Sequence, residues 1–213
     1  NGKPGNVNKV QRTYSNNPND WGRYKTDVGT TAEDFAYVYC YGLELVKVNQ
    51  ANTSEKLDGA IFVISRIEGT ITKYAIFDGN NVLQGWGANI DNATKLETVD
   101  GTFTVYGLAS GAYQIKETQA PDGFNNLPGD ITLNIVAGID SSNILNSLSG
   151  NTVGGGLAAG DYNTGLVTLT ISNTKGAVLP STGGMGTTLF YIVGVVLMLG
   201  AAAVIIAKKR ETK

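Results

Sequence analysis

Apolar and polar residues alternate along most of the chain between residues 42 and 173. A period of two places successive side chains on opposite faces of a strand, so this pattern predicts strands that bury one face. Many short strands separated by turn sequences are typical of an all-β sandwich. The predicted strands cover residues 42–49, 59–67, 71–77, 82–86, 101–108, 113–119, 131–136 and 166–173.

Three of these strands carry a polar residue in line with their apolar face. Lys47, Glu117 and Asn173 each continue an apolar series at the period of two. Glu117 illustrates the pattern, because Tyr113 and Ile115 precede it on the same face. A single residue of this kind is usually a solvated residue at a strand end. A buried carboxylate needs partners, however, and three such residues on three strands favour a buried polar site.

These strands resemble a known family. The sequence "YQIKETQAPDGF" is similar to the glutamate motif of the B-type repeat domain of the collagen adhesin (Cna-B), an immunoglobulin-like β-sandwich that forms the C-terminal domain of many Gram-positive pilins. "LELVKVN" with "LDGAIFVIS" resembles the opening strands of that domain, and "LTISNTK" its closing strand. The resemblance covers residues 41–178. It implies an intramolecular isopeptide bond between Lys47 and Asn173, with Glu117 as the catalytic acid and base.

The residue types suit this chemistry. A lysine amine is a nucleophile only when it is neutral, and burial among apolar side chains lowers its pKa. A buried glutamate can hold a proton and polarise the carbonyl group of Asn173. Attack by the Lys47 nitrogen expels ammonia, and proximity within the folded chain replaces an enzyme. The reaction takes place once per molecule, so the resemblance implies a protein that is not a turnover enzyme.

A sorting motif lies near the C-terminus. Leu179, Pro180, Ser181, Thr182 and Gly183 match the LPxTG motif of sortase substrates. The resemblance implies that a sortase cysteine attacks the Thr182 carbonyl, releases the chain from Gly183 onward and passes the acyl group to an amine. That amine belongs to a neighbouring pilin subunit or to peptidoglycan.

An apolar segment and a basic tail follow the motif. Residues 188–207 are uncharged and mostly apolar, and a helix of this length spans the core of a bilayer. The tail, residues 208–213, begins with three basic residues, which favour the cytoplasmic side. We therefore expect a transmembrane helix that holds the chain in the membrane only before sorting. A plain membrane anchor is the weaker alternative.

Residues 1–40 are expected to be the end of a preceding pilin domain and a linker. Residues 8–14 predict a strand, and "TYSNNPND" with "AYVYCYGLELVK" is similar to the junction between the last two domains of pilin shaft subunits. This resemblance suggests that the sequence continues a longer protein. Asn16 is a candidate acceptor of a second isopeptide bond, and a plain turn residue is an equal alternative for it.

The segment 138–165 has a different character. It contains the glycine-rich sequence "NTVGGGLAAGDYNTG". A phosphate-binding loop requires a strand, a glycine-rich loop with a lysine and a helix in succession, and this segment does not have that pattern. We expect a flexible surface insertion, with one short helix at residues 143–148.

Composition narrows the function classes. The net charge is −2, which argues against a nucleic-acid surface. The chain has no histidine, the usual metal ligand and general base, so we expect no metal and no cofactor. Cys40 is the single cysteine, and no intrachain disulfide can form.

The predicted function is a pilus shaft subunit on the cell wall of a Gram-positive bacterium. Its expected partners are sortase, neighbouring pilin subunits, peptidoglycan and, as a further option, a ligand on a host surface. The alternatives are a wall-anchored adhesin whose Cna-B domain is a stalk, an ancillary subunit at the pilus base or tip and, least favoured, an enzyme that acts on other molecules.

Overall fold

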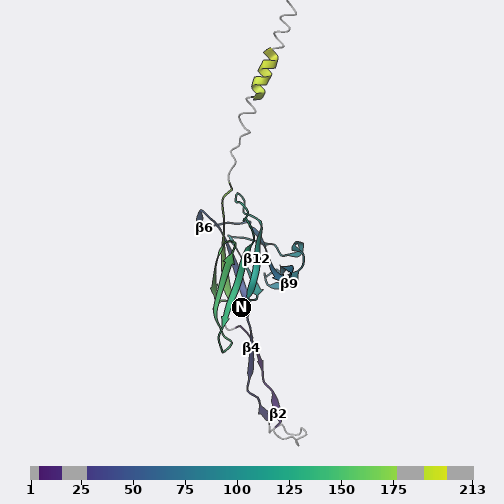
Figure 1. Cartoon of the computed structure of the whole chain (residues 1–213), viewed down its shortest axis with the longest axis vertical. Helices are drawn as coiled ribbons and strands as arrows, with labels where there is room; N and C mark the ends of the chain where they lie inside the picture. Colours follow the sequence, from purple (N-terminus) through teal and green to yellow (C-terminus); the bar gives the residue numbers. More distant parts are fainter. Residues whose placement is uncertain (1–4, 16–27, 177–189, 201–213) are drawn as a thin grey trace, which may run out of the picture. The chain divides into compact units, whose positions relative to one another are not determined.

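The computed structural model describes residues 5–15, 28–176 and 190–200. The chain divides into two units, Asn1–Lys175 and Gly176–Lys213. The first unit contains two packed sheets formed by β5 to β16, called the sandwich below, and the short strands β1 to β4 (Figure 1). The all-β sandwich expected from the sequence is confirmed. The boundaries of the predicted domain, 41–178, stay a prediction.

The larger sheet of the sandwich has the strand order β14-β13-β12-β7-β8-β9, with β10 beside β7. The smaller sheet has the order β11-β5-β16-β15, with β6 beside β5. Neighbouring strands run antiparallel except for β5 and β16, the first and last strands of the sandwich, which run parallel. The strands are β5 (Tyr41–Asn49), β6 (Asn52–Lys56), β7 (Ile61–Glu68), β8 (Ile71–Phe77), β9 (Leu83–Gly87), β10 (Leu96–Glu97), β11 (Thr102–Leu108), β12 (Gly111–Gln119), β13 (Ile131–Ile139), β14 (Leu145–Val153), β15 (Leu157–Asp161) and β16 (Leu166–Asn173).

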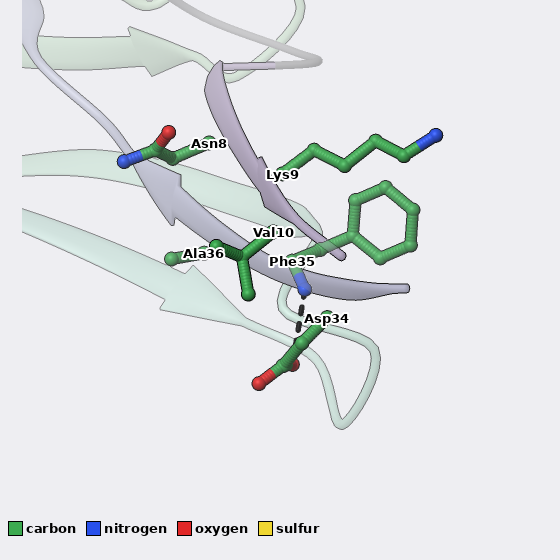
Figure 2. A pocket seen from close by; sticks show the side chains of 6 residues that line it. All are labelled: Asn8, Lys9, Val10, Asp34, Phe35 and Ala36. Atoms are coloured by element: carbon green, nitrogen blue, oxygen red, sulfur yellow. Dashed lines mark hydrogen bonds between the residues drawn. The ribbon is translucent and has the colours of Figure 1, made fainter. Parts of the chain in front are cut away.

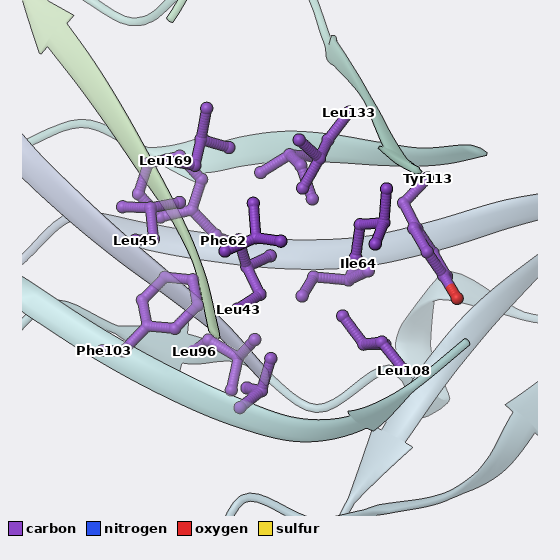
Figure 3. Close-up of a cluster of buried hydrophobic side chains, with 14 of the residues drawn as sticks. Leu43, Leu45, Phe62, Ile64, Leu96, Phe103, Leu108, Tyr113, Leu133 and Leu169 are labelled. Atoms are coloured by element: carbon purple, nitrogen blue, oxygen red, sulfur yellow. The ribbon is translucent and has the colours of Figure 1, made fainter. Parts of the chain in front are cut away.

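The core lies between the two sheets and is formed by their inward faces (Figure 3). Leu45 and Leu169 come from the smaller sheet and Leu133 from the larger one, and all three are fully buried. The rings of Phe62 and Phe103 meet across the sandwich with their centroids 5.9 Å apart. The alternating residues are therefore buried on the face that the period of two predicted, and the strands predicted at 71–77 and 166–173 coincide with β8 and β16.

The segment 138–165 differs from the prediction. In place of a flexible insertion with a helix at 143–148, the structure has β14 and β15, which are edge strands of the two sheets and pack against each other. Leu145 and Leu148 of β14 are buried in the core. The residues between the strands, 154–156, are glycines with φ of 91°, 122° and 77°, a conformation that other residues rarely adopt. The glycines that suggested flexibility thus form the turn from one sheet to the other.

Close backbone approach is a second reason for glycine in this segment. A Cβ atom on Gly160 of β15 would lie 2.4 Å from the carbonyl oxygen of Leu148 in β14. Because the interior of a protein is densely packed, only a residue without a side chain allows the two edges to meet at this distance. The β14–β15 contact therefore closes one side of the sandwich.

The short N-terminal strands form two antiparallel pairs, β1 (Asn6–Val10) with β4 (Asp34–Val38) and β2 (Thr13–Ser15) with β3 (Val28–Thr30). The strand predicted at 8–14 is thus divided between β1 and β2.

Tyr39 attaches the end of this region to the sandwich. Its ring stacks on that of Tyr37 with centroids 6.5 Å apart. The Tyr39 hydroxyl donates to the carbonyl oxygen of Asn143 at 2.8 Å and accepts from the Leu145 amide at 3.1 Å. The chain entering β5 is therefore held against the turn between β13 and β14.

In the second unit, residues 190–200 are helical (Figure 1). The rest of the predicted span, 188–189 and 201–207, lies outside the described residues, as does the tail. Among the residues that the structure describes, no helix has the length and apolar character needed to cross a membrane.

The contact between β14 and β15 gives a first prediction. Gly160→Ala should lower the free energy of unfolding by about 1–3 kcal/mol, because the added methyl group overlaps the Leu148 carbonyl. Gly85→Ala is the matched control, since Gly85 also lies in a strand but a methyl group added there would have no other atom within 4 Å. Denaturant titration measures both, and equal effects would contradict the close-approach explanation.

Candidate functional site

Three strands bring Lys47, Glu117 and Asn173 together. In the parallel pair of β5 and β16, Ile171 lies opposite Lys47, so Asn173 is two residues further along and on the same face. Glu117 comes from β12 in the other sheet and faces them across the core. The site therefore joins the two sheets near the ends of all three strands.

The three side chains form a closed ring of contacts. Lys47 Nζ lies 3.0 Å from Glu117 Oε1 and donates a hydrogen bond to Asn173 Oδ1. Asn173 Nδ2 donates to Glu117 Oε1 at 2.9 Å and to Oε2 at 3.1 Å. The Lys47 and Glu117 side chains are 0% and 1% exposed, and Asn173 is 2% exposed. Each polar group of the ring thus has a polar partner inside the core, as buried polar groups require.

The ring differs in one respect from the expected arrangement. The sequence interpretation placed the Glu117 carboxyl group at the carbonyl oxygen of Asn173, which it would polarise. In the structure, Lys47 Nζ contacts that oxygen and Glu117 contacts the amide nitrogen. The carboxyl group is therefore placed to exchange protons with both nitrogen atoms rather than to polarise the carbonyl.

The surroundings of Lys47 favour its neutral form. Its Nζ atom lies in the core, where Phe62 of β7 is fully buried. Burial lowers the pKa of Lys47 below its ordinary value, and the neighbouring charge of Glu117 opposes this shift. A larger fraction of the amine is consequently available as a nucleophile than on a solvent-exposed lysine.

Backbone features fix the position of Glu117. The pairing of β12 with β7 shifts register between Glu117 and Gln119, a bulge that bends the strand at this point. The main-chain amide of Leu127, in the loop that follows β12, donates to Glu117 Oε2 at 2.8 Å. Sequence reasoning missed this donor. Every residue except proline has a backbone N–H group, so the sequence does not show which of them will bond to Glu117.

A pocket of about 370 Å³ borders the ring at Asn173, and Ser172 and Leu127 also line it. Asn173 therefore adjoins open space, whereas Lys47 and Glu117 are not among the residues that line this pocket.

A second pocket, of about 140 Å³, lies on the β1–β4 pair (Figure 2). Its lining mixes exposed apolar and polar side chains, and Asp34 accepts a hydrogen bond from the neighbouring amide of Phe35 at 3.0 Å. This pocket has none of the buried, mutually bonded polar groups that distinguish the ring.

The remaining predicted site residues belong to parts of the chain that the structure does not describe. Asn16 and residues 179–183 lie outside the described ranges. In residues 5–15, 28–176 and 190–200, no group of three or more His, Cys, Asp or Glu side chains is arranged to hold a metal ion.

Two family models match the chain. A model described as SpaA, a prealbumin-like fold domain, matches residues 42–148, which include most of β5, all of β6 to β13 and part of β14. A model described as the LPXTG cell wall anchor motif matches residues 171–213. Together they include Lys47, Glu117, Asn173 and the predicted sorting motif.

The chain is similar to surface and pilus proteins of streptococci, both in sequence and in solved structures. The trypsin-resistant surface T6 protein of Streptococcus pyogenes serotype M6 is 28% identical over an alignment of 267 positions, which covers 99% of this chain and 46% of the relative. The crystal structure of the pilus 2b backbone protein of group B streptococcus is 24% identical, with a TM-score of 0.51, and the match covers 72% of this chain and 50% of that one. The T6 backbone pilin of serotype M6 S. pyogenes is 20% identical, with a TM-score of 0.47 and coverages of 83% and 44%. The chain thus spans about half the length of these relatives.

The burial of Lys47 predicts a pH dependence of stability that is visible when no bond can form. In Asn173→Ala the amine stays free, and its pKa in the folded state lies below the ordinary value of 10.5. The unfolded chain then binds more protons between these two values, so the free energy of unfolding should rise as pH increases toward 10.5. Urea titrations from neutral to alkaline pH measure this rise. The control is Asn173→Ala combined with Lys47→Met, in which the rise should vanish; a rise of equal size in the control would contradict the assignment to Lys47.

Proposed function

The chain belongs to the SpaA family of prealbumin-like fold domains and carries the LPXTG anchor motif of the Gram-positive cell wall surface, and on this premise we propose that it is a pilus shaft subunit stabilised by a Lys47–Asn173 isopeptide bond. The observation that carries the proposal is the buried ring of Lys47, Glu117 and Asn173. The protein acts as a structural element and as its own substrate.

Bond formation uses the geometry of the ring. In its neutral form, which burial favours, Lys47 Nζ attacks Cγ of Asn173, whose carbonyl oxygen it already contacts. Glu117 takes a proton from the Lys47 nitrogen and gives a proton to Asn173 Nδ2, which makes the poor leaving group leave as ammonia. The C–N bond of the side-chain amide breaks as the new one forms, and the pocket over Asn173 offers ammonia a way out.

The crosslink would stabilise the fold because it closes a long loop. Lys47 and Asn173 are 126 positions apart in the sequence. The loop-entropy relation used for disulfides gives about 5 kcal/mol for a closure of this length. The chain has one cysteine, so an intrachain disulfide cannot supply this stabilisation.

The shaft role is supported by the relatives. The similar chains are a surface protein and a pilus backbone protein of streptococci. In the proposed assembly, sortase cleaves after Thr182 and joins the Thr182 carbonyl to an amine of a neighbouring subunit or of peptidoglycan. Every subunit of the shaft would then be linked covalently to the next.

The bond predicts a mass defect of one ammonia in the purified protein. Glu117→Ala should fold and show the full mass of its sequence, because no group relays the proton, and Lys47→Ala should do the same. Glu117→Gln keeps the shape and a hydrogen-bond donor but cannot relay a proton, so it should react slowly or not at all. Intact-mass spectrometry decides between the outcomes. Loss of ammonia in Glu117→Ala would remove Glu117 from the mechanism, and the full mass in the unmodified chain would remove the bond.

Sorting predicts a polymer that depends on Thr182. In cells with sortase, the protein should migrate as a ladder of high-mass species on denaturing gels, and Thr182→Ala should abolish the ladder. Thr187→Ala, outside the motif, is the control and should leave it intact. Intact Thr182–Gly183 bonds in wall-released material would refute the role of this motif.

A further inference from the structure

The loop of residues 124–128, called the site loop here, bonds to Glu117 of the ring and to the residues that follow Asn173. The Leu127 amide donates to Glu117 Oε2 at 2.8 Å. The Asn125 amide donates to the carbonyl oxygen of Thr174 at 2.9 Å, directly after Asn173. Phe124 forms an isolated bridge with Lys175, one residue further along. The same loop therefore fixes the position of the acid and of the strand end that carries the amide.

The two oxygen atoms of Glu117 have different surroundings. Oε1 lies 3.0 Å from Lys47 Nζ and 2.9 Å from Asn173 Nδ2, the atoms that lose and gain a proton when the bond forms. Oε2 accepts from the Leu127 amide at 2.8 Å and lies 3.1 Å from Asn173 Nδ2. Both neighbours of Oε2 are amide N–H groups, which can only donate, whereas a neutral Lys47 amine beside Oε1 can also accept. Oε1 is therefore the better carrier of the carboxyl proton.

We propose that the main-chain amide of Leu127 is a positioning group for isopeptide formation, an inference that rests on the proposed Lys47–Asn173 bond. It holds Oε2 as a hydrogen-bond acceptor and leaves Oε1 to carry the proton. Oε1 then receives one proton from Lys47 Nζ and delivers one to Asn173 Nδ2. One C–N bond forms, one breaks, and ammonia leaves with the transferred proton, so the carboxyl group ends in the state in which it began.

The site loop is built to hold this amide in place. The Leu127 side chain packs against the hydrophobic core. Pro128 disfavours the helical backbone conformation at Leu127, which narrows the directions its N–H can take. The loop end is thus fixed by side-chain packing and by the following proline, and its N–H does not have to be ordered at the moment of reaction.

The test separates the Leu127 N–H group from the Leu127 side chain. The full chain is made by cell-free synthesis in two forms, one with the α-hydroxy analogue of leucine at position 127, which replaces the N–H by an ester oxygen, and one with Leu127→Ala, which keeps the N–H. Each is released from denaturant, and ammonia loss is followed by intact mass. We expect the ester to react about tenfold more slowly or worse, the usual effect of losing a hydrogen bond to a charged group. Leu127→Ala keeps the N–H but loses its side-chain packing, so its rate should lie between those of the ester and the unmodified chain.

A spectroscopic measurement supplements the rates. The Leu127 amide resonance in ¹⁵N-labelled protein should move upfield in Glu117→Ala, whereas the Asn125 amide, which is bonded to Thr174, should stay in place. An ester that reacts as fast as the unmodified chain, or Leu127→Ala that slows the reaction as much as the ester, would overturn the positioning role. These results would leave the bond itself intact, whereas the absence of ammonia loss from the unmodified chain would overturn the proposed function instead.

Discussion

The burial of the Lys47 amine among apolar side chains is the constraint on which the rest of the site depends. A polar group without a partner in such a place costs free energy whether it is charged or neutral. Lys47 therefore requires Glu117 and Asn173, and this requirement restricts three strands at once. A slip of β16 by one residue would turn Asn173 to the outer face and remove the acceptor of Lys47. The polar ring thus specifies the register of these strands. Apolar side chains alone would specify it less strictly, because one apolar residue can replace another in the core at a smaller cost.

Much of this arrangement could be predicted from local pattern. Alternation along β5, β12 and β16 was enough to point Lys47, Glu117 and Asn173 inward, because side-chain direction in a strand follows from counting by two. The pairing of β5 with β16 was not available from that pattern. Their contacts join residues more than a hundred positions apart, and no local signal specifies that the two strands are parallel or which residue lies opposite Lys47. The family resemblance, not the alternation, supplied the expectation that Lys47 and Asn173 lie together, and it did not specify the pairing of the strands.

The prediction of a flexible insertion at 138–165 was wrong for a different physical reason. A run of glycines has the same composition whether it forms a flexible loop or a tight turn, and only the neighbouring packing decides. Here Leu145 and Leu148 bury their side chains, but their spacing of three does not follow the period of two of a strand, so it did not predict β14. Gly160 then fits where Leu148 leaves no room for a side chain. The orientation of Glu117 toward the amide nitrogen was beyond sequence reasoning for a similar reason, since a backbone donor in the site loop takes part in setting it.

The proposed bond would relieve the constraint that assembles the site. Before reaction, the core holds an amine, a carboxyl group and an amide whose partners must all be present. After reaction, the amine and the amide have become one neutral secondary amide, which can no longer take up a proton at neutral pH. The crosslink also joins the first and last strands of the sandwich, which lie side by side and parallel. Tension that enters the chain at β5 and leaves it at β16 would pass through the bond, so the residues between Lys47 and Asn173 would carry no load. Burial of Lys47 costs free energy when the domain folds, and the bond formed by the same residue would make the folded domain difficult to extend under tension.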